Sequence, residues 1–316
     1  MHDKIKEHSA SAARIEYIMA VCIYGSISIL IRYADFPSEA LAFYRAIFGA
    51  LFIFLYQKVR GQKQDRDAVR ENMKWLILSG ASLGLNWIFL FGAYVKIPIS
   101  IASLINYTAP VITVAIAPLV LHEKLDMRKL PFIFTSFAGV VFVSGVLEGG
   151  VPAAVGSSGD SFIGLIFGML ASLTFVGILV FSRKMSYIPP LDRVFWQLVS
   201  ASVVIGVYLL ITEHSIPVPQ DPQTLIVVII LGAVYTALAN ILYFAGVIGL
   251  PVQAVAILGY LESVTAIIVS LVVFHEPMSA LAWVGAVLII ASAVLSETMP
   301  AKKESGETIS PGKERS

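Results

Sequence analysis

The chain reads PISIASLINYTAPVITVAIAPLVLHE from Pro98 to Glu123, and PVQAVAILGYLESVTAIIVSLVVFHE from Pro251 to Glu276, 153 residues later. Aligned without a gap, the two stretches share their first proline, an internal tyrosine and a final His-Glu pair. Each is apolar over the roughly 20 residues that a membrane-spanning helix needs. Proline is tolerated in the first turn of a helix because its missing N–H would have no partner there. We therefore predict one long apolar helix at matching places in two halves of the chain.

The composition makes lipid the solvent of this protein. Of 316 residues, 57% are hydrophobic and 14% are charged, against roughly 25% charged residues in soluble domains. Such a chain cannot cover a globule with polar surface, so the lipid bilayer is its first expected partner. A net charge of +1 gives no basic surface for nucleic acid. The single cysteine, Cys22, excludes an internal disulfide and a metal site built from several cysteines.

We predict an all-α membrane protein with ten transmembrane helices, two repeats of five. The ten apolar runs are 15–33, 38–57, 73–94, 98–121, 130–147, 161–182, 190–212, 223–247, 251–274 and 279–297. The first repeat is expected at 15–147 and the second at 161–297, flanked and joined by a cytoplasmic segment at 1–14, an external linker at 148–160 and a disordered cytoplasmic tail at 298–316.

Basic residues orient the predicted helices. With ten spans, nineteen of the 22 Lys and Arg residues fall on the side of both termini, Arg32 and Lys96 fall on the other, and Arg45 lies inside a span. The positive-inside rule then puts both termini in the cytoplasm of a bacterial-type inner membrane. Because each half has an odd number of spans, the halves are inverted, which predicts a central cavity with a binding site near the membrane midplane.

Two charged residues stand at membrane depth, where an unpaired charge is costly. Glu262 lies roughly 16 Å into the run that begins at Pro251, and Arg45 about 10 Å into the run that begins at Ser38. We interpret Glu262 as a coupling residue for a proton or cation, or else as a structural carboxyl. Arg45 either reaches inward toward Glu262 or extends to the lipid headgroups.

Amides and aromatic rings at membrane depth are the candidates for substrate binding. A single buried amide or phenol is more often a contact between helices than a ligand. As a set these residues favour a cavity lined by rings and a few polar groups, which is how small-molecule sites are built. The candidates are Asn86, Trp87, Asn106, Tyr107, Asn240, Tyr243 and Tyr260.

The sequence offers no metal site, cofactor motif or catalytic set. His122-Glu123 and His275-Glu276 do not extend to H-E-x-x-H, and the predicted topology puts the two pairs on opposite faces. We interpret both pairs as helix stops at the membrane surface. The chain has no G-x-S-x-G, C-x-x-C or phosphate-binding loop, so neither enzyme chemistry nor direct driving by ATP is expected.

Four segments resemble the EamA family of the drug/metabolite transporter superfamily. They are FYRAIFGALF at 43–52, GLNWIFLFGAY at 84–94, SLINYTAPVITVAIAPLVLHEKL at 103–125 and LGYLESVTAIIVSLVVFHEPMS at 258–279. In this resemblance Glu123 and Glu276 match the glutamates that end the fourth and ninth helices, and Arg45 matches the arginine of the second. Ser263 departs from the proline usual after Tyr-Leu-Glu. The resemblance implies ten helices around a cavity that opens alternately to each side.

The resemblance implies a secondary transporter that exports, or less often takes up, a small metabolite such as an amino acid, and Glu262 makes a proton the candidate coupling ion. The alternatives are a channel, a membrane assembly partner that transports nothing, and a membrane-embedded enzyme acting on lipid. The enzyme would need a nucleophile–base set or metal cluster, and neither is found. A small molecule is the expected ligand, and the chain is expected to act as a monomer or homodimer.

Overall fold

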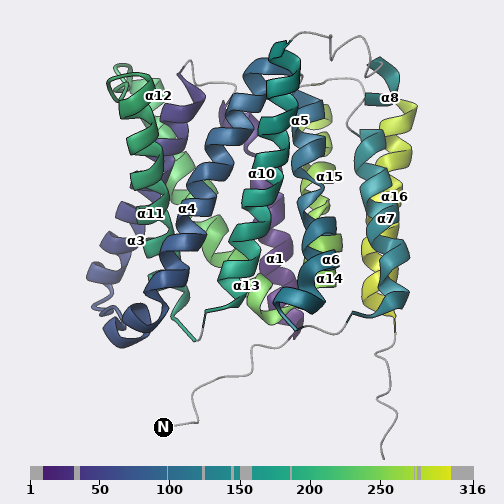
Figure 1. Ribbon diagram of the computed structural model, residues 1–316, viewed down its shortest axis with the longest axis horizontal. Coiled ribbons are helices and arrows are strands. Elements are labelled where there is room, and N and C mark those ends of the chain that lie inside the picture. The colour runs from purple at the N-terminus through teal and green to yellow at the C-terminus, as the bar shows by residue number, and fades with distance from the viewer. Residues whose placement is uncertain are drawn as a thin grey trace, which may run out of the picture.

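The structure is a computed structural model that describes residues 10–31, 36–97, 99–122, 125–143, 146–149, 159–185, 187–273, 275 and 279–299. Every regular element in these residues is helical, and they contain no strand. The helices stand side by side as a bundle, with the start of α1 and the end of α16 at the same end of the molecule (Figure 1). The prediction of an all-α fold is confirmed for this part of the chain.

The elements follow the predicted runs in order. In the first half they are α1 (Ala10–Gly25), α2 (Ser28–Ile31), α3 (Ser38–Val59), α4 (Arg66–Lys96), α5 (Ile99–Asn106), α6 (Ala109–Val120), η1 (Met127–Lys129), α7 (Leu130–Val143) and α8 (Val146–Gly149). In the second half they are α10 (Gly159–Arg183), α11 (Pro190–Thr212), α12 (Pro222–Gly232), the π-helical turn η2 (Ala233–Leu238), α13 (Ala239–Gly249), α14 (Val252–Gly259), α15 (Leu261–Val273) and α16 (Ala280–Thr298).

Within the described residues, seven helical segments are long and apolar enough to cross a membrane, and Ala280–Ser296 is a shorter apolar helix. The exact number of ten spans stays a prediction. Two helices begin earlier than expected: α1 starts at Ala10, and α4 starts at Arg66 because the Asp65 side chain accepts a hydrogen bond from the Ala68 N–H at 3.0 Å. The tail, most of the 148–160 linker and residues 1–9 lie outside the described residues.

Each repeated stretch forms an apolar span, as predicted, at Ala102–Val120 and Val252–Val273, but its helix is interrupted by a turn rather than continuous. The first copy breaks between α5 and α6 at Tyr107-Thr108, and the second breaks between α14 and α15 at Tyr260. Pro110 explains the first break, because it offers no N–H to the carbonyl of Asn106 four residues earlier. Ser263 stands 153 residues after Pro110. Its N–H donates to the Tyr260 carbonyl at 3.1 Å, three residues back, so the chain tightens at the second break.

Both copies also end alike. His122 and His275 have φ of 56° and 54°, in the left-handed region that ends many helices. The next helical segments begin 153 residues apart, with the side chains of Asp126 and Ser279 as N-caps. The Arg128 side chain hydrogen-bonds to Asp126 and lowers the pKa of that carboxyl to about 2, so the cap stays charged at physiological pH.

Small residues set the closest helix contacts, as expected where lipid rather than water surrounds the bundle. α7 packs on α16, α4 on α10, and α1 on α13. At the first crossing two glycines face each other: a Cβ on Gly285 would lie 2.5 Å from the carbonyl oxygen of Gly139, and one on Gly139 would lie 2.7 Å from that of Gly285. The contacting atoms belong to the backbone, so an added side chain cannot be accommodated by a change of rotamer.

We predict that Gly285→Val lowers the stability of the detergent-solubilised protein, by about 2 kcal/mol, the usual cost of overpacking. The control is Val287→Ile on the same helix, where the side chain is 62% exposed and has room for another methylene. The melting temperature of each variant is measured by heating samples and recording the folded fraction by size-exclusion chromatography. Equal melting temperatures for the two variants would contradict the close contact between α7 and α16.

Candidate functional site

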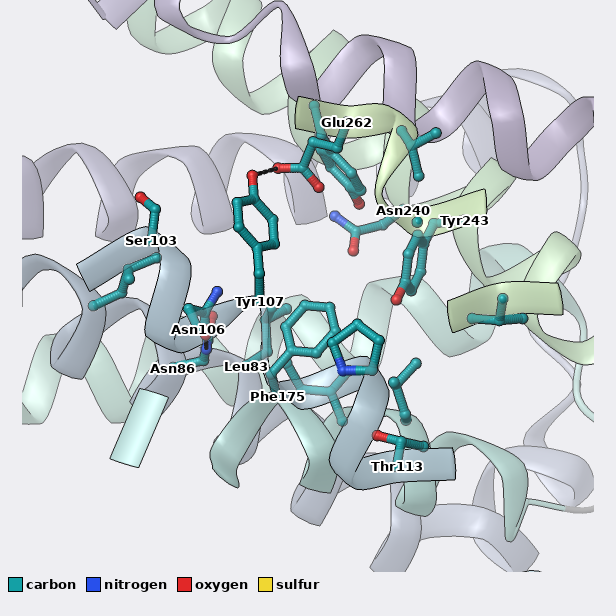
Figure 2. A pocket seen from close by; sticks show the side chains of 18 of the residues that line it. Leu83, Asn86, Ser103, Asn106, Tyr107, Thr113, Phe175, Asn240, Tyr243 and Glu262 are labelled. Carbon is teal, nitrogen blue, oxygen red and sulfur yellow. Dashed lines mark hydrogen bonds between the residues drawn. The ribbon is translucent and has the colours of Figure 1, made fainter. Parts of the chain in front are cut away.

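A cavity of about 260 Å³ lies inside the bundle. Its walls come from α1, α3, α4, α5, α6, α10, α13, α14 and α15, and all nine residues proposed from the sequence line it: Arg45, Asn86, Trp87, Asn106, Tyr107, Asn240, Tyr243, Tyr260 and Glu262. Figure 2 shows side chains from separate helices converging on this space. The structure therefore brings together residues that are far apart in the sequence.

Glu262 lies in the first turn of α15, directly after the break at Tyr260. The Tyr107 hydroxyl donates to its Oε1 at a long 3.5 Å (Figure 2). In return, the Tyr260 hydroxyl donates at 3.1 Å to the Tyr107 carbonyl, which lies at the other break. The two tyrosine rings meet edge to face with centroids 6.5 Å apart. Each break thus supplies a hydrogen bond to a group at the other break.

Arg45 is buried, with 9% of its surface exposed, so it does not extend to the headgroups. Its Nε donates to the Thr236 hydroxyl at 3.1 Å, and its guanidinium carbon lies 4.0 Å from the centroid of the Trp87 ring. A guanidinium over an indole is a favourable arrangement where water is scarce. No ion pair joins Arg45 to Glu262 in the described part of the chain. The predicted pairing of the two stays a prediction.

The three asparagines hold different positions. Asn86 Nδ2 donates to the Ala171 carbonyl at 2.7 Å and to Asn106 Oδ1 at 3.2 Å, so it joins α4 to α10 and α5. Asn240 Nδ2 donates to the Thr236 carbonyl of its own helical stretch at 2.7 Å. The Asn240 side chain lies between Glu262 and Tyr243 in Figure 2. Asn86 therefore serves helix packing, while Asn240 faces the groups that line the cavity.

Sequence reasoning missed several polar and aromatic wall residues. Tyr17 and Tyr24 are seven residues apart, hence on one face of α1, and their rings lie 5.2 Å and 5.9 Å from that of Tyr243. That spacing is visible in the sequence and marks the face of α1 that lines the cavity. Tyr94 and Ser103, whose hydroxyls lie 3.1 Å apart, also line the cavity and stand near the ends of predicted spans.

Among the described residues, the cavity wall combines the carboxyl group of Glu262, the guanidinium of Arg45 and several aromatic rings. Such a site can hold a small molecule with an apolar body and one or two polar or charged groups. Among the described residues no group of three or more His, Cys, Asp and Glu side chains gathers in a way that could hold a metal ion. The chemistry on offer is hydrogen bonding, charge pairing and ring stacking.

Known proteins match this chain over most of its length. The sequence model of the EamA-like transporter family matches residues 15–145 and 162–298, one match in each half. The chain therefore belongs to the EamA-like transporter family, which agrees with the resemblance seen in the sequence. It is a multi-pass membrane protein, and the family points to transport rather than enzyme chemistry.

Two relatives come from Bacillus subtilis (strain 168). The uncharacterized transporter YxxF is 24% identical over 270 residues, covering 85% of this chain and 84% of its own. The uncharacterized transporter YojE is 24% identical over 235 residues, 74% of each chain. A crystal structure aligns with a TM-score of 0.78 at 16% identity, covering 91% of this chain and 98% of the other. This similarity shows a shared fold and nothing more.

We predict that Tyr260→Phe destabilises the protein by about 1 kcal/mol, because it leaves the half-buried carbonyl of Tyr107 without its donor. Tyr24→Phe is the matched control: Tyr24 lines the same cavity, and its hydroxyl makes no hydrogen bond to the described residues. Thermal unfolding in detergent compares the two. A melting temperature for Tyr260→Phe equal to that of Tyr24→Phe would rule out a structural role for this hydrogen bond.

Proposed function

We propose that the protein is a secondary transporter that exports a small metabolite such as an amino acid across the cytoplasmic membrane by alternating access. The observation that carries this proposal is the cavity in which Glu262 and Arg45 share a wall of aromatic rings. A zwitterion with an apolar side chain matches that combination, because its ammonium complements Glu262, its carboxylate complements Arg45, and its side chain complements the rings. Export is the direction that the resemblance to the family favours.

The proposed transporter has ten transmembrane helices in two inverted repeats. Support comes from features that recur 153 residues apart: the breaks at Tyr107 and Tyr260, the left-handed His122 and His275, and the matched N-caps. Broken helices at corresponding places in two halves are the usual location of a transporter's binding site. The excess of basic residues on one side supports cytoplasmic termini.

Glu262 is the proposed coupling residue, with a proton as the coupling ion. It is the acidic residue among the described residues that line the cavity, and a proton on it removes a charge from the low-dielectric interior. Its position one residue past Leu261, where α15 begins, connects that change of charge to a helix break. A ligand or proton can shift a conformational equilibrium only through such a differential interaction with the two states.

A channel is the second candidate, because inverted halves also occur in channels. A carrier exchanges cargo through a saturable site, so labelled substrate enters vesicles that hold unlabelled substrate, whereas flux through a pore does not depend on the internal pool. Proteoliposomes loaded with mixed amino acids, and challenged with labelled aromatic and aliphatic ones, separate the two. Flux without saturation or counterflow would favour the channel.

We predict that Glu262→Gln abolishes the pH dependence of counterflow and lowers the flux at least tenfold when a pH gradient drives it. The neutral amide keeps the shape of the side chain but cannot take up or release a proton. Glu39→Gln, the same change in the first turn of α3 and outside the cavity wall, is expected to leave both properties intact. An unchanged flux with an unchanged pH profile in Glu262→Gln would exclude the coupling role.

We also predict that the charges of Arg45 and Glu262 are energetically coupled during transport. Arg45→Ala and Glu262→Ala, made singly and together, are expected to be non-additive by about 0.5–3 kcal/mol, as interacting residues usually are. Initial counterflow rates at several substrate concentrations supply the free energies. Additive effects would mean that the two charges act independently and that a single cargo does not bridge them.

A further inference from the structure

An aromatic pair lies on the surface of the bundle where α4 passes from charged to apolar residues. Trp75 directly follows Lys74, and its ring stacks on Phe181 of α10, with centroids 6.0 Å apart and an interplanar angle of 27°. The two helices pack along each other (Figure 1). An indole at the border between charged and apolar surface is the usual position of tryptophan at the membrane–water interface. Neither aromatic residue of the pair belongs to the cavity wall.

Two ammonium groups converge on this indole from different helices. Lys74 Nζ lies 5.0 Å from the centroid of the Trp75 ring, and Lys184 Nζ, just after the end of α10, lies 5.5 Å from it. The ring attracts each cation, but two like charges around one ring repel each other. Between the described residues, no ion pair involves either lysine. The two cations thus lie around one ring, and neither is paired with an acidic side chain of the described residues.

Exposed apolar side chains continue from this cluster along the bundle. On α10, the helix that carries Phe181, Leu173 and Met169 are 53% and 60% exposed. Leu173 and Met169 are four residues apart, hence on one face of α10. A free anion gains nothing from contact with apolar side chains, whereas the acyl chains of a lipid would cover them.

We propose that Lys74, Trp75 and Lys184 form a binding site for the headgroup of an anionic phospholipid. The phosphate lies between the two ammonium groups, the indole borders the glycerol region, and the acyl chains lie along Leu173 and Met169 of α10. The anion relieves the repulsion between the lysines. Phosphatidylcholine places its positively charged choline near the two lysines and therefore binds less well. The site is independent of the transport cavity and of what the cavity carries.

The test measures lipid binding by the purified full-length protein after delipidation in detergent. Phosphatidylglycerol, phosphatidylcholine and inorganic phosphate are titrated separately, with retained lipid counted by native mass spectrometry and thermal stability followed in parallel. Each lysine near an anionic headgroup contributes about a fivefold gain in affinity. We expect Lys74→Gln with Lys184→Gln to bind phosphatidylglycerol about 30-fold more weakly and to lose most of its stabilisation by that lipid.

Two control variants accompany the test. Lys58→Gln with Lys63→Gln makes the same change of charge at lysines that lie over no aromatic ring in the described residues, and it is expected to bind like the parent. Lys74→Arg with Lys184→Arg keeps the charge and is expected to retain binding. The proposal is overturned if the glutamine pair binds phosphatidylglycerol within twofold of the Lys58/Lys63 control. It is also overturned if phosphatidylcholine or inorganic phosphate stabilises the parent as well as phosphatidylglycerol does.

Discussion

A helix that breaks inside a membrane must find other partners for its freed backbone groups, because lipid supplies none. This protein meets that constraint by placing its two breaks against each other. The Tyr260 hydroxyl donates to the Tyr107 carbonyl, and the Tyr107 hydroxyl donates to Glu262. The bonded pair joins the two breaks where α6 packs on α14, beside residues of the cavity wall. The half-buried carboxyl of Glu262 acquires a donor through the same arrangement.

Charge imposes the second constraint. Arg45 is stabilised away from water by the face of Trp87 and the hydroxyl of Thr236, which belong to α4 and to the π-helical turn η2. A π-helical turn inside an α-helix is rare and often lies at a functional site. Here it carries the partner of the buried guanidinium. The cavity is therefore held by groups on several helices, and a shift of any one of them changes the surroundings of a charge.

Much of this could be read from the sequence, and the limits have physical causes. Apolar runs of about 20 residues locate spans because bilayer thickness sets helix length. Polar residues at depth pointed to the cavity, since a buried polar group needs a partner or water. The break at Tyr260 could not be predicted from the sequence, because no proline marks it. The backbone N–H of Ser263 donates to the Tyr260 carbonyl there. The contact between Arg45 and Trp87 joins two helices and depends on their packing, which no local pattern encodes.

The two halves share their pattern of broken helices but differ in their charged residues. At the shift of 153 residues Glu262 corresponds to Ala109, and at the shift of 152 that aligns Phe43 with Phe195, Arg45 corresponds to Gln197. Gln197 donates to the hydroxyls of Ser79 and Ser182 instead of lining the cavity. Each half thus contributes one charge of opposite sign. A charged cavity exists only where the halves meet, so the relative placement of the halves and the electrostatics of the site change together.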